Sequence, residues 1–216
     1  MIKKLPFYRN YTTNQWSRWW KNRKIDWNKE YAQTWNHPHR NIIVGLLNTF
    51  SWLSLIEIGC GAGANLIKIA KNLPGKQLGG VDINPEAIAE AERIFEGGVF
   101  KVCPADDVMM SDKSTDVSLT DMTLIYVSPL KITKHLKELK RITRNYIIIC
   151  EFHSESWWQR LKLRLTTGYN AYNYKKRLQE LGFYDIITYK IPDELWPGVK
   201  NDKFRFIIKA KVPRRY

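Results

Sequence analysis

The sequence predicts an α/β fold in which helices cover a doubly wound, mainly parallel sheet of about seven strands. Short apolar runs alternate with helically spaced apolar residues from about residue 53 onwards, a pattern typical of such sheets. The run at 146–150 is apolar on both faces, as expected for a central parallel strand. A glycine-rich turn at 59–63 separates the first apolar run from the first helical stripe. A chain of 216 residues is long enough for one well-buried core.

Each strand is an apolar or alternating run that ends near glycine, proline or polar residues. The expected strands cover 53–58, 77–83, 99–103, 116–120, 146–150, 184–190 and 204–211. In the last run apolar residues mostly alternate with basic ones. We therefore expect this terminal strand to be antiparallel, half-exposed and near an edge of the sheet.

Helices are expected wherever apolar residues recur at helical spacing between these strands. The expected stripes cover 42–50, 66–70, 88–95, 132–139 and 174–181. The clearest start signal is Asn84-Pro85-Glu86, which offers an N-cap, a proline at the first helical position and an acid in the first turn. Gly182 is suited to close the last helix.

The net charge of +14 lies entirely in the two ends of the chain. Residues 1–40 and 151–216 each sum to +7, whereas residues 41–150 sum to zero. The same two ends hold eight of the nine Trp. We divide the chain into a basic, Trp-rich N-terminal segment, 1–40, with an irregular arm up to residue 15, and a main domain, 41–216.

The strongest chemical signal is a loop with three evenly spaced glycines. Gly59, Gly61 and Gly63 follow Glu57 at two-residue steps. Glycine lets the backbone approach a ligand, and the helix after the loop favours a carboxylate or phosphate at its N-terminus. A dinucleotide site needs the third glycine three residues after the second. The spacing therefore argues against a pyrophosphate.

Asp82 ends the second expected strand, 19 residues after Gly63. A carboxylate at this place can accept hydrogen bonds from both hydroxyls of a ribose. The glycine loop and this acid together predict a ribonucleoside site.

These motifs resemble those of the class I S-adenosylmethionine-dependent methyltransferases, which have a Rossmann-like fold. The segments that carry the resemblance are Glu57–Gly63, Val81–Pro85, Asp112–Val117, Thr120–Asp121 and Tyr126–Val127. It extends from about residue 42 to 152, and more loosely to 211. The resemblance implies S-adenosylmethionine as cofactor, S-adenosylhomocysteine as product, and no metal.

The resemblance also implies which residues surround the cofactor. Those around the methionine part would be Glu57, Gly59, Gly61 and Asn65, with Cys60 and Gly63 in the same loop. Asp82 and Ile83 would hold the ribose and adenine, and Thr120 would face the sulfur. Near the adenine amine, Pro104 stands where the family often has Asp. Ala105 fits the family pattern, and Asp106 would take over the polar contact.

Methyl transfer mainly requires alignment of the acceptor with the donor, and it needs a general base only for some acceptors. Asp121 and His153 are the candidate catalytic residues, because they follow the fourth and fifth strands, and ligands bind at strand ends. His153 is preferred as the base because its ordinary pKa lies near neutrality. The alternative is a structural histidine.

Four aromatic residues are candidates for the acceptor site: Tyr31, Trp35, Tyr126 and Tyr169. Tyr31 and Trp35 share a helical face with Trp27, for which core packing is the alternative. Residues 153–170 form an insertion after the fifth strand. One of its faces is apolar and another carries two arginines, so we interpret it as a cap over the acceptor pocket.

Three kinds of partner suit the basic, Trp-rich ends. A small acidic acceptor in a closed pocket is preferred. Nucleic acid and an anionic membrane surface are the alternatives. A non-catalytic subunit that binds S-adenosylmethionine is a rival function, and the sequence does not indicate the oligomeric state.

Three features point to the cytoplasm. The N-terminus has no apolar region typical of export signals. No window approaches the roughly 20 apolar residues of a membrane span. The three cysteines lack metal-like spacing, and buried thiols in a reducing compartment explain them.

Overall fold

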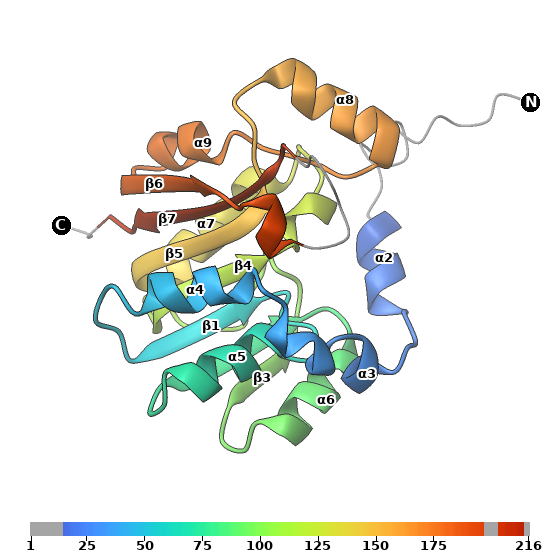
Figure 1. Ribbon diagram of the computed structural model, residues 1–216, viewed down its shortest axis with the longest axis vertical. Helices are drawn as coiled ribbons and strands as arrows, with labels where there is room; N and C mark the ends of the chain where they lie inside the picture. Colours follow the sequence, from blue (N-terminus) through green and yellow to red (C-terminus); the bar gives the residue numbers. More distant parts are fainter. Residues whose placement is uncertain (1–14, 197–202, 214–216) are drawn as a thin grey trace, which may run out of the picture.

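A computed structural model describes residues 15–196 and 203–213. Most of the predicted irregular arm therefore lies outside the described residues. The core is a seven-stranded sheet in the order β3-β2-β1-β4-β5-β7-β6 (Figure 1). The first five strands in this order are parallel, and β7 is antiparallel to both of its neighbours. The predicted α/β architecture is confirmed.

All seven strands lie close to their expected positions. They are β1 (Ser54–Ile58), β2 (Gln77–Asp82), β3 (Val99–Val102), β4 (Thr115–Asp121), β5 (Thr143–Phe152), β6 (Tyr184–Lys190) and β7 (Arg205–Lys211). The terminal strand is antiparallel and lies next to an edge strand, as expected, but it is not half-exposed. β7 lies between β5 and β6, and Arg205 and Ile207, on its supposedly exposed face, are buried. The strand at this edge of the sheet is β6, which is mostly exposed.

Two helical layers cover the sheet because side chains of each central strand alternate between its faces. On β5, Ile147 and Ile149 pack with the layer that contains α7 (Ile132–Ile142) and α9 (Tyr174–Glu180). Ile148 packs with the opposite layer. That layer contains α4 (Arg40–Leu47), α5 (Ala64–Asn72) and α6 (Pro85–Ile94). Figure 1 shows α4 and α5 on the near side of the sheet and α7 behind it.

The N-terminal aromatics do not form one continuous helix. The chain forms α2 (Gln15–Lys21), α3 (Trp27–Glu30) and a short 3-10 helix, η1 (Ala32–Asn36). The break after residue 30 ends the periodicity expected from Trp27 to Trp35. After β5 comes α8 (Trp157–Thr167). Among the described residues, no helix is long and apolar enough to cross a membrane.

Asn84 joins the N-terminal helices to the sheet. Its Oδ1 accepts hydrogen bonds from the backbone N–H of Glu86 (2.9 Å) and of Ala87 (3.1 Å), which caps α6 as predicted. Its Nδ2 donates to the backbone oxygens of Trp20 (2.7 Å) and Arg23 (2.9 Å). One buried amide therefore both starts α6 and holds the end of α2 in place.

Two substitutions separate these roles. Asn84→Ala removes the cap and both donated bonds, so we expect unfolding free energy to fall by about 2 kcal/mol. Asn84→Asp keeps the cap but cannot donate to the two backbone oxygens. We expect Asn84→Asp to preserve most of the stability in urea while trypsin cleaves more rapidly near Arg23. Equal cleavage rates for wild type and both variants would contradict this anchoring role.

Candidate active site

A cavity of about 430 Å³ opens at the carboxyl ends of β1, β2 and β4. The strand order reverses between β1 and β4, and ligands bind at this point in doubly wound sheets. The strand-end loops form its floor, whereas α2, α3 and the segment before α4 contribute the opposite wall. The cavity therefore lies where the sequence predicts a ligand.

The glycine loop is held against β2 and brings backbone to the cavity. The backbone N–H groups of Gly59 and Cys60 donate to Val81 O, at 2.7 and 3.0 Å. Gly59 has φ +77°, and a Cβ there would lie 2.2 Å from the Thr123 hydroxyl oxygen. Gly59, Cys60 and Gly61 line the cavity, whereas Gly63 precedes the first turn of α5. Glycine is thus required at Gly59 by both conformation and space.

Asp82 faces the same loop from the end of β2. One carboxylate oxygen accepts from the Gly61 N–H and the other from the Asn84 N–H, both at 2.9 Å. Burial raises the pKa of this carboxyl, although the backbone donors oppose that effect. The adjoining wall consists of Ile83, Cys103, Pro104, Ala105 and Asp106. Asp106 also pairs with Lys134, at 3.2 Å.

A buried polar network forms another part of the cavity wall. The Asn65 amide donates to Glu57 (2.6 Å) and to Asp121 (2.9 Å). Asp121 is also 2.8 Å from His39 Nε2, and His39 Nδ1 is 2.5 Å from His37 Nδ1. The network joins β1, α5, β4 and the segment before α4.

Burial and charge act differently on the two carboxyls of this network. Burial raises the pKa of Glu57 to about 8, and the nearby Asp121 adds to the shift. Burial also works to raise the pKa of Asp121, but His39 and Arg40 hold it well below its usual range. Asp121 is therefore ionised at neutral pH. Glu57 is largely protonated while no cation lies beside it, and a bound ammonium group would favour its ionised form, which accepts hydrogen bonds.

Several polar atoms here have no partner among the described residues. They are Glu57 Oε2 and Asn65 Oδ1, which accept hydrogen bonds, and Arg40 Nε, which donates. All three residues line the cavity. Buried polar atoms rarely remain unpaired in native structures. The oxygens suit an ammonium group and the guanidinium suits a carboxylate, so this region fits the zwitterionic end of an amino acid.

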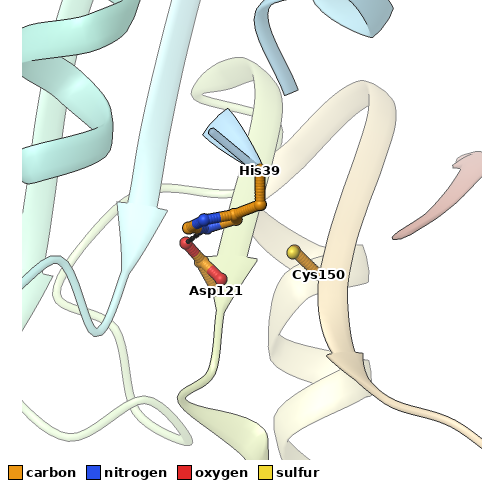
Figure 2. Close-up of side chains that lie close together, drawn as sticks. All are labelled: His39, Asp121 and Cys150. Carbon is orange, nitrogen blue, oxygen red and sulfur yellow. Dashed lines mark hydrogen bonds and ion pairs between the residues drawn. The ribbon is translucent and has the colours of Figure 1, made fainter. Parts of the chain in front are cut away.

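His39, Asp121 and Cys150 form the one potential metal-ligand trio found among the described residues (Figure 2). Their potential ligand atoms lie within 4.8 Å of one another. Both His39 nitrogens already have partners, and burial raises the pKa of the Cys150 thiol well above its ordinary value. The trio is thus explained by hydrogen bonding, and the absence of a metal remains a prediction.

The structure does not bring His153 to the cavity. Its side chain is 3% exposed, and its Nδ1 accepts a hydrogen bond from the Tyr174 N–H (3.2 Å). Burial lowers its pKa. His153 packs under α9 and is absent from the cavity lining. The interpretation as a general base was wrong, because proximity to a strand end does not determine where a side chain points.

Besides His153 and Gly63, three predicted residues lie outside the cavity lining. Thr120 is buried within the sheet beside Glu151. The Trp35 ring lies instead under the Lys71 ammonium, at 4.6 Å. Tyr169 packs on Tyr126, with ring centroids 5.6 Å apart, one layer behind the lining. In each case the local pattern identified the region but not the direction of the side chain.

Aromatic residues form a wall opposite the strand ends. Tyr31 and Tyr126 line the cavity as predicted, together with Trp16 and Trp20 of α2, whose part in the cavity the sequence did not predict. Trp20 packs against both tyrosines, with centroid separations of 6.2 Å to Tyr31 and 5.3 Å to Tyr126. The wall joins residues from α2 to the segment after β4.

Sequence reasoning also missed His37, His39 and Arg40, which line the cavity. Their only signal was a cluster of titratable residues just before a predicted helix. The partner of His39, Asp121, lies 82 residues away, and no local pattern identifies such a pair.

Known proteins that resemble this chain are methyltransferases. Residues 55–145 match the family model described as a methyltransferase domain. These residues include the glycine loop, Asp82 and the network carboxylates. This match to a methyltransferase domain covers 91 of the 216 residues. No curated protein sequence matches the chain.

Three solved structures share the fold of this methyltransferase domain. The magnesium protoporphyrin IX methyltransferase of Synechocystis, solved with S-adenosylmethionine, has a TM-score of 0.61 and 16% identity, over 92% of this chain and 90% of that one. A phosphoethanolamine N-methyltransferase of Haemonchus contortus has a TM-score of 0.63 and 15% identity, and the match covers 82% of this chain and 53% of that one. A chain from the complex of the Haloferax volcanii Trm112 methyltransferase activator with a methyltransferase has a TM-score of 0.64 and 14% identity. This match covers 85% of this chain and 93% of that one.

The raised pKa of Glu57 predicts a specific dependence of stability on pH. The folded protein binds a proton at Glu57 between pH 4.5 and about 8, where the unfolded chain has released it. This group therefore makes unfolding free energy fall as pH rises through that range, on the order of 2 kcal/mol between pH 5.5 and 7.5. In urea titrations at these two pH values, Glu57→Gln should lose this part of the pH dependence.

Glu86→Gln, at an exposed position of α6, is the matched control and should titrate like wild type. An identical pH dependence in wild type and Glu57→Gln would show that Glu57 is ionised in the folded protein.

Proposed function

We propose that the chain is an active methyltransferase that transfers the methyl group of S-adenosylmethionine to an oxygen or nitrogen atom of a small acceptor. The observation that carries the proposal is that one cavity holds the Asp82 carboxylate, placed at the end of β2, together with unpaired polar atoms on Glu57, Asn65 and Arg40. A nucleoside joined to an amino acid matches both features: its ribose suits the Asp82 carboxylate, and its amino-acid end suits the unpaired atoms.

Each part of the cofactor has candidate ligands in this chain. Asp82 would accept from the ribose hydroxyls, and Ile83 with residues 103–106 would enclose the adenine. Glu57 and Asn65 would receive the ammonium, and Arg40 the carboxylate. When bound, the cofactor supplies the electrophilic methyl group. The protein's own contribution is to align an acceptor and exclude water.

The aromatic wall is our candidate for the acceptor side. The indole N–H groups of Trp16 and Trp20 are buried and have no acceptor among the described residues. Both side chains line the cavity, so an acceptor that presents oxygen atoms would satisfy them. This supports a small, oxygen-bearing acceptor such as an acid. RNA or another nucleic acid, and a non-catalytic cofactor-binding role, remain the alternatives.

His37 replaces His153 as the candidate proton acceptor. It lines the cavity, and burial together with His39 lowers its pKa to about 4. It is therefore neutral at physiological pH, with Nδ1 engaged by His39, so a proton from the acceptor would be taken at Nε2. His39 and Asp121 would position the ring, and Asp121 is thus a positioning residue rather than a base.

Calorimetry with S-adenosylhomocysteine tests the cofactor site without knowledge of the acceptor. Wild type should bind, and Asp82→Ala should bind about tenfold to hundredfold more weakly because a charged hydrogen-bond acceptor is lost. Asp185→Ala, which removes an exposed carboxylate of β6 paired with Lys211, is the control and should bind like wild type. The cofactor assignment fails if folded wild type releases no heat, or if Asp82→Ala changes nothing.

A screen of small acceptors for release of S-adenosylhomocysteine then separates an enzyme from a binding subunit. If the cofactor binds while neither small acceptors nor RNA and DNA substrates yield product, the non-catalytic alternative is favoured.

A further inference from the structure

Helix α8 turns its apolar side away from the protein. Trp157, Trp158, Leu161 and Leu165 fall within an arc of about 100° at 3.6 residues per turn. Trp157 is 55% exposed, Trp158 64% and Leu165 50%. The two indole rings stack on each other, with centroids 3.8 Å apart. No residue of α8 is buried.

The inward side of α8 carries Leu163, which packs against the cluster of Ile125, Phe152 and Ala171, together with two arginines. Arg160 donates to the backbone oxygens of Ser154 and Glu155, both at 2.8 Å. Arg164 donates to Asn170 Oδ1, at 2.7 Å. These bonds fix the rotation of the helix, because turning the apolar side inward would break them.

This orientation corrects the interpretation of residues 153–170 as a cap. None of these residues, all of which the structure describes, lines the cavity. The segment lies beside the cavity rather than over it. Tyr169, just after α8, contacts both Trp16 and Tyr126 of the aromatic wall. Tyr169 therefore connects the C-terminal end of α8 to the acceptor side of the cavity.

Exposed basic residues flank this apolar side. Lys162, Lys175 and Lys176 are exposed, although the last two lie 4.0 Å from Glu155 and 3.9 Å from Glu180, respectively. Across the Tyr169 contact, α2 adds exposed Arg18, Trp19 and Lys21. Figure 1 shows α8 and α2 on the same side of the molecule.

We propose that α8, with the adjoining end of α2, docks on the surface of a bilayer that contains anionic lipids. Tryptophan and leucine on an exposed helix enter the boundary between headgroups and acyl chains, while Lys and Arg attract anionic headgroups. A bilayer is favoured over RNA because leucines lie between the two tryptophans on the same arc of the helix, and lipid accommodates such an apolar surface without a shaped partner. Docking would bring the aromatic wall close to the lipid. The inference does not depend on methyl transfer.

Sedimentation with vesicles tests this surface. Full-length protein should sediment with phosphatidylglycerol–phosphatidylcholine vesicles in 0.1 M salt and bind at least about tenfold more weakly to pure phosphatidylcholine. Trp157→Ser combined with Trp158→Ser should weaken binding to the anionic vesicles by about tenfold or more. The matched control is Val99→Ser with Val102→Ser, which removes exposed apolar side chains from the distant edge strand β3.

Three results would overturn the proposal: no sedimentation of wild type with anionic vesicles, equal loss in both double variants, or no loss in the tryptophan variant. Binding of single-stranded RNA that depends on Trp157 and Trp158, without vesicle binding, would assign the surface to nucleic acid instead. Calorimetry with S-adenosylhomocysteine on the same preparations reports the cofactor site separately, so failure of docking and failure of the proposed function are distinguishable.

Discussion

The buried carboxylate of Asp121 is the interaction on which the site depends. It ends β4, where the strand order reverses, and a charge at this depth requires hydrogen-bond partners. Asn65 of α5 and His39, just before α4, provide them. Asn65 in turn holds Glu57 of β1. Four segments that are remote in the sequence are therefore fixed relative to one another by one charge.

The network leaves some of its own polar atoms unpaired, and this links its structural role to binding. Asn65 uses its amide hydrogens on two carboxylates, while its carbonyl oxygen and one oxygen of Glu57 remain without partners among the described residues. A site that is stable and yet unsatisfied in this way is preorganised for a cationic group. Because its members are already held in place, little ordering is required when a ligand arrives.

The basic, aromatic ends of the chain prove to have separate roles. From the N-terminal end, Trp16, Trp20 and Tyr31 close the cavity from the side opposite the strands. From the C-terminal half, α8 exposes Trp157 and Trp158. The contact of Tyr169 with Trp16 joins the two regions. This contact is the physical basis for proposing one partner surface that includes both α2 and α8.

The sequence by itself determined the strand and helix alternation, the glycine loop and Asp82. These features follow from local periodicity and from residues that are close together in the chain. The tertiary structure decided the direction of each side chain. It turned His153 under α9, buried Thr120 and placed β7 inside the sheet. It also paired His39 with an acid 82 residues away and rotated the apolar side of α8 outward. Periodicity shows which residues share a face, but contacts between distant segments determine what that face meets.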